Sequence, residues 1–194
     1  MDLAGRRPDA SSIVAIGGEG VPDRASLVAL VSDVERQHGD ALLGFVHRLR
    51  IDDDLAEDLV QEALLRLYDE MLSGTSIEDP RAWIFTVIYR LAMNEHRRRS
   101  RWRHLLFRTG AIKSGGANPA NAGDPVSVSE RRMVWGEVDR LPERQRAVLY
   151  LRYRADLPFD AIGGVLGITA SAARSHATQA IGTLRLRLAR EEGH

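Results

Sequence analysis

Residues 161–180 read AIGGVLGITASAARSHATQA, and this stretch decides the fold that the sequence predicts. Pro158 opens a short helix whose inner face carries Ile162, Val165 and Leu166. Gly167 then supplies the left-handed residue of a turn, and Thr169 caps a second helix. A helix, a glycine turn and a capped helix make up the helix-turn-helix pattern.

The second helix of this pair has an apolar face and a polar face. The apolar face consists of Ala173, Ala177, Ile181, Leu184 and Leu188. In the major groove of DNA, the N-terminal half of the helix would present Ser171, Arg174, Ser175 and Thr178. Many such helix pairs are merely structural, so the pattern alone is a weak signal for DNA binding. Gly163 and Gly164 lie inside the first helix, where each is expected to cost about 1 kcal/mol.

The rest of the chain divides around this pair. Residues 1–24 lack periodicity and are predicted to be a loose, disordered tail. Residues 25–108 are helical in pattern almost throughout, and 130–194 form a second helical block. Between them, residues 109–129 read TGAIKSGGANPANAGDPVSVS, the composition of a flexible linker. The sequence therefore predicts an all-α protein of two small helical domains.

Composition excludes several classes. The 194 residues contain no cysteine, which excludes disulfides, thiolate catalysis and cysteine-based zinc sites. No apolar run approaches the roughly 20 residues that span a bilayer, so we expect a cytoplasmic protein without membrane insertion. The 27 basic residues balance 27 acidic ones, and a zero net charge argues at first against nucleic-acid binding.

Placed along the chain, the charges separate into opposed blocks. Residues 33–70 contain eleven acidic and four basic residues, a net charge of −7. Residues 90–108 contain seven arginines and one acid, and residues 131–190 contain eleven arginines and five acids; each block has a net charge of +6. Such a distribution suits two partners of opposite charge.

The acidic block contains the predicted helix DLAEDLVQEALLRLY at 54–68. One apolar stripe runs along it, formed by Ala56, Leu59, Val60, Ala63, Leu64 and Leu67. Asp58, Gln61 and Glu62 lie off this stripe, and Asp52–Asp54 stand at the positive end of the helix. Periodicity alone favours a solvated acidic face; the functional alternative is a docking surface for a basic partner.

A further helix is predicted from Pro80 to about Arg101, with Asp79 as its N-cap. Its buried stripe is Ile84, Val87, Ile88 and Leu91. A second face gathers Trp83, Thr86, Arg90, Asn94, Arg97 and Arg101, bordered by Tyr89 and Met93. Arginine binds phosphate, asparagine reads base edges, and tryptophan stacks on unpaired bases. Seven arginines in 90–108 exceed what a helix dipole requires, so we favour a nucleic-acid surface.

The motifs AEDLVQE (56–62) and DPRAWIFTVIYRLAMNEHRRR (79–99) resemble region 2 of bacterial RNA polymerase sigma factors, in particular the extracytoplasmic-function (ECF) class of the sigma-70 family. The resemblance implies that Asp58, Gln61 and Glu62 contact the β′ clamp helices of core polymerase. It implies that the following loop and helix recognise and melt the −10 element and capture a flipped base. The residues that would face this DNA are Trp83, Arg90, Asn94, Arg97, Arg98 and Arg101. The family usually has Asn or Asp at the position of Arg90, and Asp at the position of Asn94. Both departures bear on which −10 sequence would be read.

LPERQRAVLYLRY (141–153) and the opening stretch together resemble sigma region 4, which binds the −35 element and the polymerase β flap. The implied −35 contacts are Ser171, Arg174, Ser175, His176 and Thr178. Only about 20 residues separate the regions, too few for a folded region 3, which points to the ECF class. The linker spans ~70 Å when fully stretched but only ~25 Å as a relaxed coil. Two DNA turns span about 70 Å, so promoter binding would require a nearly extended linker.

The resemblance implies a promoter-specificity factor that is not an enzyme, needs no cofactor or metal, and commonly has an anti-sigma partner. One alternative is a stand-alone helix-turn-helix regulator, against which the acidic docking helix argues. Another is an enzyme using Asp52, Asp53, Asp54 and Glu57 near His47, but no histidine ligand set or glycine-rich phosphate loop supports it. The lone histidines His38, His47, His96 and His104 are expected on surfaces or near phosphates.

Overall fold

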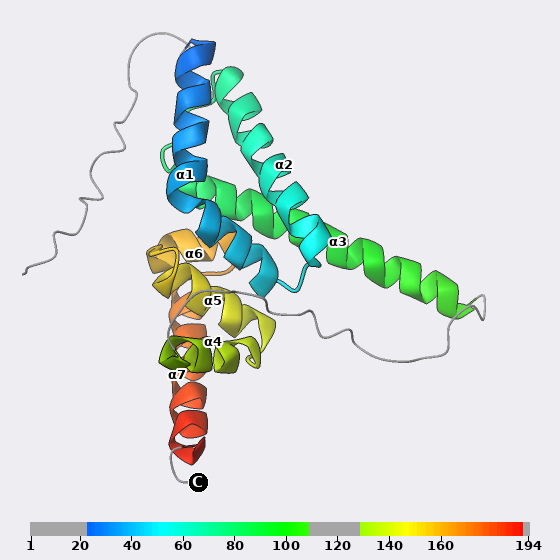
Figure 1. Cartoon of the computed structure of the whole chain (residues 1–194), viewed down its shortest axis with the longest axis vertical. Helices are drawn as coiled ribbons and strands as arrows, with labels where there is room; N and C mark the ends of the chain where they lie inside the picture. Colours follow the sequence, from blue (N-terminus) through cyan, green and yellow to red (C-terminus); the bar gives the residue numbers. More distant parts are fainter. Residues whose placement is uncertain (1–22, 109–128, 192–194) are drawn as a thin grey trace, which may run out of the picture.

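The computed structural model describes residues 23–108 and 129–191. These residues form seven α-helices and no strand, which confirms the predicted all-α fold. The helices are α1 (Arg24–Arg48), α2 (Asp53–Leu72), α3 (Pro80–Arg108), α4 (Ser129–Asp139), α5 (Glu143–Tyr153), α6 (Phe159–Leu166) and α7 (Ala170–Glu191) (Figure 1). Most of the predicted tail and most of the predicted linker lie outside the described residues, and α1 already begins at Arg24, the last residue assigned to the tail.

Helices α1, α2 and α3 pack on one another and form the first helical block. Asp23 caps α1 by accepting a hydrogen bond of 2.8 Å from the backbone N–H of Ser26. The rings of Phe45 on α1 and Phe85 on α3 meet edge to face, with centroids 5.4 Å apart, in the centre of this block. The apolar stripe predicted for α2 faces the same core, which confirms the helical period read from the sequence.

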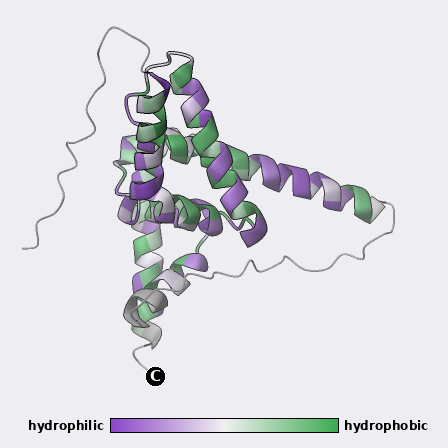
Figure 2. Cartoon of the chain, turned by 45° about the horizontal axis from the view of Figure 1, so that its top comes forward, coloured by the Kyte–Doolittle hydropathy of each residue, from purple (hydrophilic) through white to green (hydrophobic). Residues whose placement is uncertain are grey.

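Helix α3 begins as its cap predicts but ends later. The Asp79 carboxylate accepts a 2.9 Å hydrogen bond from the N–H of Ala82, and Pro80 occupies the first helical position. The helix continues to Arg108 rather than ending near Arg101, and its C-terminal half projects beyond the bundle (Figure 1). The projecting part is largely hydrophilic (Figure 2). The helix can therefore continue into solvent beyond the point where it leaves the core. The core also takes Phe85 and Ala92, which the predicted stripe omitted.

The second block contains the helix-turn-helix, formed by α6 and α7. Gly167 has the predicted left-handed backbone, with φ of 65°. The Thr169 hydroxyl caps α7 by accepting a 3.1 Å hydrogen bond from the N–H of Ala172. Helix α5 packs against both α6 and α7, and α4 packs against α5 and α7.

The two blocks are packed directly on each other through α1 with α5 and α3 with α6. Tyr150 on α5 stacks on Phe45 of α1, with ring centroids 5.9 Å apart, and its hydroxyl donates a 3.1 Å hydrogen bond to the carbonyl of Ala41. Gly44 makes this approach possible, because a Cβ there would lie 2.2 Å from the Tyr150 hydroxyl. The buried residues of both blocks consequently form one continuous core.

The glycine pair in α6 has two different environments, which corrects the expectation of a simple helix penalty at both positions. A Cβ on Gly163 would lie 2.7 Å from the backbone oxygen of Ile168, so the turn needs glycine there. A Cβ on Gly164 would meet nothing within 4 Å.

We expect Gly163→Ala to lower the free energy of unfolding by about 1–3 kcal/mol, because the backbone of the turn must move. Gly164→Ala is the matched control and should raise it by up to about 1 kcal/mol, since alanine is the better helix former. Urea unfolding followed by circular dichroism measures both. Equal effects of the two substitutions would contradict the assignment of the close contact to Gly163.

Candidate functional site

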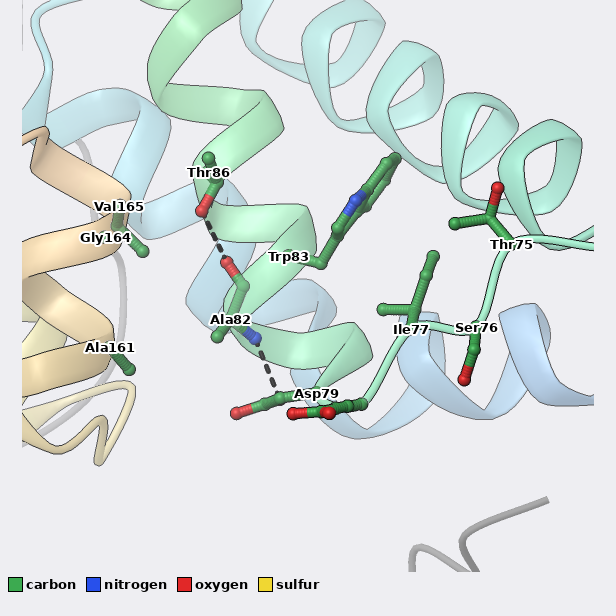
Figure 3. Close-up of a pocket in the computed structure, with 11 residues that line it drawn as sticks. Thr75, Ser76, Ile77, Asp79, Ala82, Trp83, Thr86, Ala161, Gly164 and Val165 are labelled. Carbon is green, nitrogen blue, oxygen red and sulfur yellow. Dashed lines mark hydrogen bonds between the residues drawn. The ribbon is translucent and has the colours of Figure 1, made fainter. Parts of the chain in front are cut away.

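The N-terminal half of the predicted −10 face lines an open pocket of about 460 Å³ between the two blocks (Figure 3). The first block contributes Trp83 and Thr86 of α3 and the preceding loop, residues 75–79. The second block contributes Ala161, Gly164 and Val165 of α6. Figure 3 shows these three residues opposite Ala82 and Thr86. Helix α6 of the helix-turn-helix thus forms one wall of the pocket that Trp83 and Thr86 of the predicted −10 face also line.

The resemblance implied that the loop before α3 takes part in −10 recognition but pointed to none of its residues. The structure shows which of them line the pocket. Thr75, Ser76 and Ile77 line it beside Trp83 (Figure 3). Gly74 has φ of 87°, which turns the chain sharply after α2. The sequence signal for this loop is the run of small polar residues SGTS at 73–76 before the Asp79 cap.

The C-terminal half of the predicted −10 face is exposed on α3. Arg90, Asn94, Arg97 and Arg101 all lie at the surface, as does Arg98. Arg98 is already paired, because its guanidinium donates hydrogen bonds of 2.7 and 3.1 Å to Glu95. The hydrogen bond from Arg98 lowers the pKa of the Glu95 carboxyl, and Arg99 adds to this effect. The positive charge that is free for phosphate therefore lies mainly on the other arginines of this half.

Two contacts fix the middle of α3 against the corner between α1 and α2. Arg99 bridges Glu95 at 2.8 Å and Asp52 at 2.7 Å. A ring nitrogen of His96 lies 2.7 Å from the carbonyl oxygen of Leu49. His96 is half-buried and contacts the backbone, whereas it was expected at the surface or near a phosphate. The arginine face of α3 consequently has a fixed orientation relative to α2.

The three residues predicted to contact polymerase, Asp58, Gln61 and Glu62, are exposed on α2. Gln61 donates a 3.3 Å hydrogen bond to Glu35 of α1, and Glu62 accepts one of 2.8 Å from Arg66. Leu65 stands one turn further along with 60% of its surface exposed. The face therefore combines the exposed carboxylates of Asp58 and Glu62, the second of them paired with Arg66, with one exposed apolar side chain, which suits a basic partner with an apolar contact of its own.

On α7 the structure separates the predicted −35 residues into two groups. Ser171, Arg174, Ser175 and Thr178 are exposed on the outer face of the helix. His176 is half-buried, and its Nδ1 is buried with no hydrogen-bond partner in the described structure. At most the other ring nitrogen of His176 can reach a phosphate. Ala173 and Ala177 are buried on the inner face, as predicted.

A buried polar cluster joins the two blocks behind these surfaces. The Arg146 guanidinium donates hydrogen bonds of 2.6 Å to the carbonyl of Arg48, and of 3.1 Å to the carbonyls of both Asp139 and Leu141. The Arg48 guanidinium is 3.1 Å from the Asp139 carboxylate. Burial raises the pKa of Asp139, against the opposing effect of Arg48, and burial lowers the pKa of Arg146. The motif LPERQRAVLYLRY includes Arg146, but its spacing gives no sign of a partner in the first block.

Within residues 23–108 and 129–191, no group of three or more His, Asp or Glu side chains is placed to hold a metal ion. In the same part of the chain, no helix has the length and apolar character to cross a membrane. Of the residues named for the enzyme alternative, His47 lies 3.5 Å from the Asp53 carboxylate. The exposed surfaces are an acidic face on α2 and arginine-bearing faces on α3 and α7.

The fold defines an all-α protein with a helix-turn-helix, and comparison with known proteins shows its family. The family model for Sigma-70 region 2 matches residues 36–102, and the model for Sigma-70 region 4 matches residues 138–186. The chain is 30% identical over 166 residues to the ECF RNA polymerase sigma factor SigL of Mycobacterium tuberculosis, covering 84% of this chain and 92% of that protein. It belongs to the ECF family of sigma-70-type RNA polymerase sigma factors, non-catalytic proteins that direct transcription initiation.

The chain is also similar to other known proteins. SigJ of Mycobacterium tuberculosis is 33% identical over 157 residues, covering 77% of this chain and 48% of that protein. Among solved structures, the sigma factor RpoE in complex with the anti-sigma factor NepR from Bartonella quintana has a TM-score of 0.59 at 22% identity, over 85% of this chain and 95% of that one. CnrH in complex with the cytosolic domain of CnrY has a TM-score of 0.55 at 18% identity, over 87% and 97%. These two structures share the fold with the chain.

We expect Tyr150→Phe to lower the free energy of unfolding by about 1 kcal/mol, because it removes the hydrogen bond between the blocks and keeps the ring stack. Tyr153→Phe on the same helix is the control, since Tyr153 is 61% exposed, and it should change little. Urea unfolding measures both variants. A Tyr150→Phe variant as stable as wild type would argue that the two blocks do not pack in solution as they do here.

Proposed function

We propose that the chain docks on core RNA polymerase through α2 and reads a promoter through α3 and α7. Asp58, Gln61 and Glu62 would contact the β′ clamp helices, and region 4 would bind the β flap. The single observation that supports the docking surface best is that all three residues are exposed while the apolar stripe of the same helix is buried. The proposal includes the division of the chain into region 2, linker and region 4. It also includes that the protein acts in the cytoplasm.

For the promoter, we assign the −10 element to Trp83, Arg90, Asn94, Arg97, Arg98 and Arg101, and the −35 element to Ser171, Arg174, Ser175, His176 and Thr178. The exposure of the arginines and the fixed orientation of α3 support this assignment. The pairing of Arg98 with Glu95 makes it the weakest candidate on α3 for a phosphate contact. Run-off transcription with core polymerase on a selected promoter library tests the whole function; no promoter-specific transcript would contradict it.

Docking on polymerase is tested by charge reversal on α2. We expect Asp58→Arg with Glu62→Arg to reduce binding of core polymerase by at least about tenfold, because two carboxylates facing a basic partner become repulsive. Asp33→Arg with Asp40→Arg changes the net charge equally on the exposed surface of α1 and should bind nearly as wild type. Fluorescence anisotropy of labelled protein with core polymerase measures both. Equal loss in the two variants would mean that net charge, and not this face, drives binding.

Binding to a promoter would require the two blocks to separate. The −10 and −35 elements lie about two DNA turns, or about 70 Å, apart, whereas α3 and α6 are in direct contact here. Helix α6 also lines the pocket beside Trp83. We therefore propose that the described arrangement is the free state, and that polymerase binding holds the blocks apart with the linker extended.

The separation is measurable because the chain has no cysteine of its own. Val28→Cys on α1 and Leu186→Cys on α7 replace exposed apolar side chains and accept spin labels. We expect the distance between the labels, measured by double electron–electron resonance, to increase when core polymerase is added. An unchanged distance distribution in the complex would rule out the separation.

An anti-sigma factor is a further proposed partner. RpoE, which shares this fold, was crystallised in complex with the anti-sigma factor NepR, and CnrH, which also shares it, was solved in complex with the cytosolic domain of CnrY.

A further inference from the structure

The helix-turn-helix contains an aromatic contact that its sequence pattern does not require. Phe159 is the first residue of α6, and its ring lies near two arginines, one on α5 and one on α7. The Cζ atom of Arg174 on α7 is 5.7 Å from the ring centroid, and the Cζ atom of Arg152 on α5 is 5.4 Å from it. Both distances are within the range of a cation–π contact.

The backbone before Phe159 and the core beneath it hold the ring in place. Pro158 precedes it with an extended backbone at the helix start, and Leu157 before that is fully buried. Phe159 itself is half-buried and packs on the core. Arg152 is anchored separately, because its guanidinium donates a 3.1 Å hydrogen bond to the carbonyl of Leu157. The ring is therefore a fixed support rather than a mobile side chain.

Arg174 depends on this support for its orientation. It is exposed on the outer face of α7, and it forms no ion pair within the described parts of the chain. A free arginine side chain samples many rotamers, and ordering it on DNA binding costs conformational entropy. A guanidinium that already lies against an aromatic ring loses less freedom when it binds, because its plane is oriented in advance.

We propose that Phe159 is a positioning residue that orients the Arg174 guanidinium for bidentate recognition of a guanine in the −35 element. This inference rests on the proposed function, in which α7 lies in the major groove. Guanine is the base that offers two acceptors, O6 and N7, to the arginine fork in the major groove. Ser171 and Ser175 on the same face are too short to span both acceptors, so Arg174 is the residue that sets this base preference.

The test compares holoenzymes reconstituted from core polymerase and the full chain on a promoter obtained by selection. Phe159→Leu keeps an apolar side chain and removes the ring, and Phe159→Tyr is the matched control that keeps the ring. Promoter affinity should fall about two- to fivefold for Phe159→Leu, the range of an exposed cation–π contact, and stay near wild type for Phe159→Tyr. Arg174→Ala should reduce affinity about 5- to 100-fold.

Two readouts separate positioning from a merely structural role. Replacing the −35 guanines by 7-deazaguanine removes the N7 acceptor and leaves base pairing intact. Wild type and Phe159→Tyr should lose affinity on this DNA, Phe159→Leu should lose less, and Arg174→Ala should lose nothing. In the double variant, Phe159→Leu should have no additional effect once Arg174 is alanine.

The outcomes distinguish the two levels of the argument. If Arg174→Ala binds the promoter as wild type does, the assignment of α7 as the recognition helix fails, and this inference fails with it. If Arg174→Ala weakens binding but Phe159→Leu equals Phe159→Tyr, the recognition helix stands and the positioning role is wrong. If Phe159→Leu lowers affinity equally for guanine and 7-deazaguanine DNA, the ring supports the fold alone, which also overturns the proposal.

Discussion

The buried guanidinium of Arg146 is the interaction on which the arrangement of the two helical blocks depends. It donates hydrogen bonds to the carbonyls of Arg48, at the end of α1, and of Asp139, at the end of α4. Helix C-termini carry partial negative charge and unpaired carbonyls, so one cation satisfies two helix ends that would otherwise need water. A buried charge is costly without such partners. The ends of α1 and α4 must therefore meet at this point, which brings α5 against α1 and α6 against α3.

The same packing has a consequence for binding. Helix α6 covers the part of α3 that includes Trp83 and Thr86, while the arginine-rich half of α3 and the outer face of α7 stay exposed. In the proposed function, a polymerase that separates the blocks must replace the contacts of Tyr150 and Arg146 with contacts of its own. The acidic face of α2 lies apart from the junction and is exposed while the blocks are packed together. In the proposed function, docking therefore precedes separation, and the free energy of docking drives it.

Which features the sequence could predict follows from the range of the interactions. The Asp79 cap, the Gly167 turn and the Thr169 cap each depend on residues within a few positions, and all three were predicted correctly. The contacts of Arg146 with Arg48 and of Tyr150 with Ala41 join residues about a hundred positions apart, and neither hydrophobic period nor charge reveals them. Gly163 was misjudged for a different reason: the atom that excludes a side chain is the backbone oxygen of Ile168 in the turn that follows, and helix propensity says nothing of how closely that turn folds back on the helix.

The structure most alters the interpretation of the charged residues, because it shows which arginines are already paired. Counting arginines in 90–108 treats them as equivalent, but Arg98 and Arg99 are paired with acids, and Arg99 serves to fix α3 against Asp52. In the second block Arg146 is buried and Arg152 holds a backbone carbonyl. Part of each basic block is therefore structural, and the charge offered to phosphate is smaller than the sum. If α3 and α7 bind DNA as we propose, the modest free charge makes recognition rely more on how each remaining guanidinium is oriented, and the fixed face of α3 and the ring of Phe159 would supply that orientation.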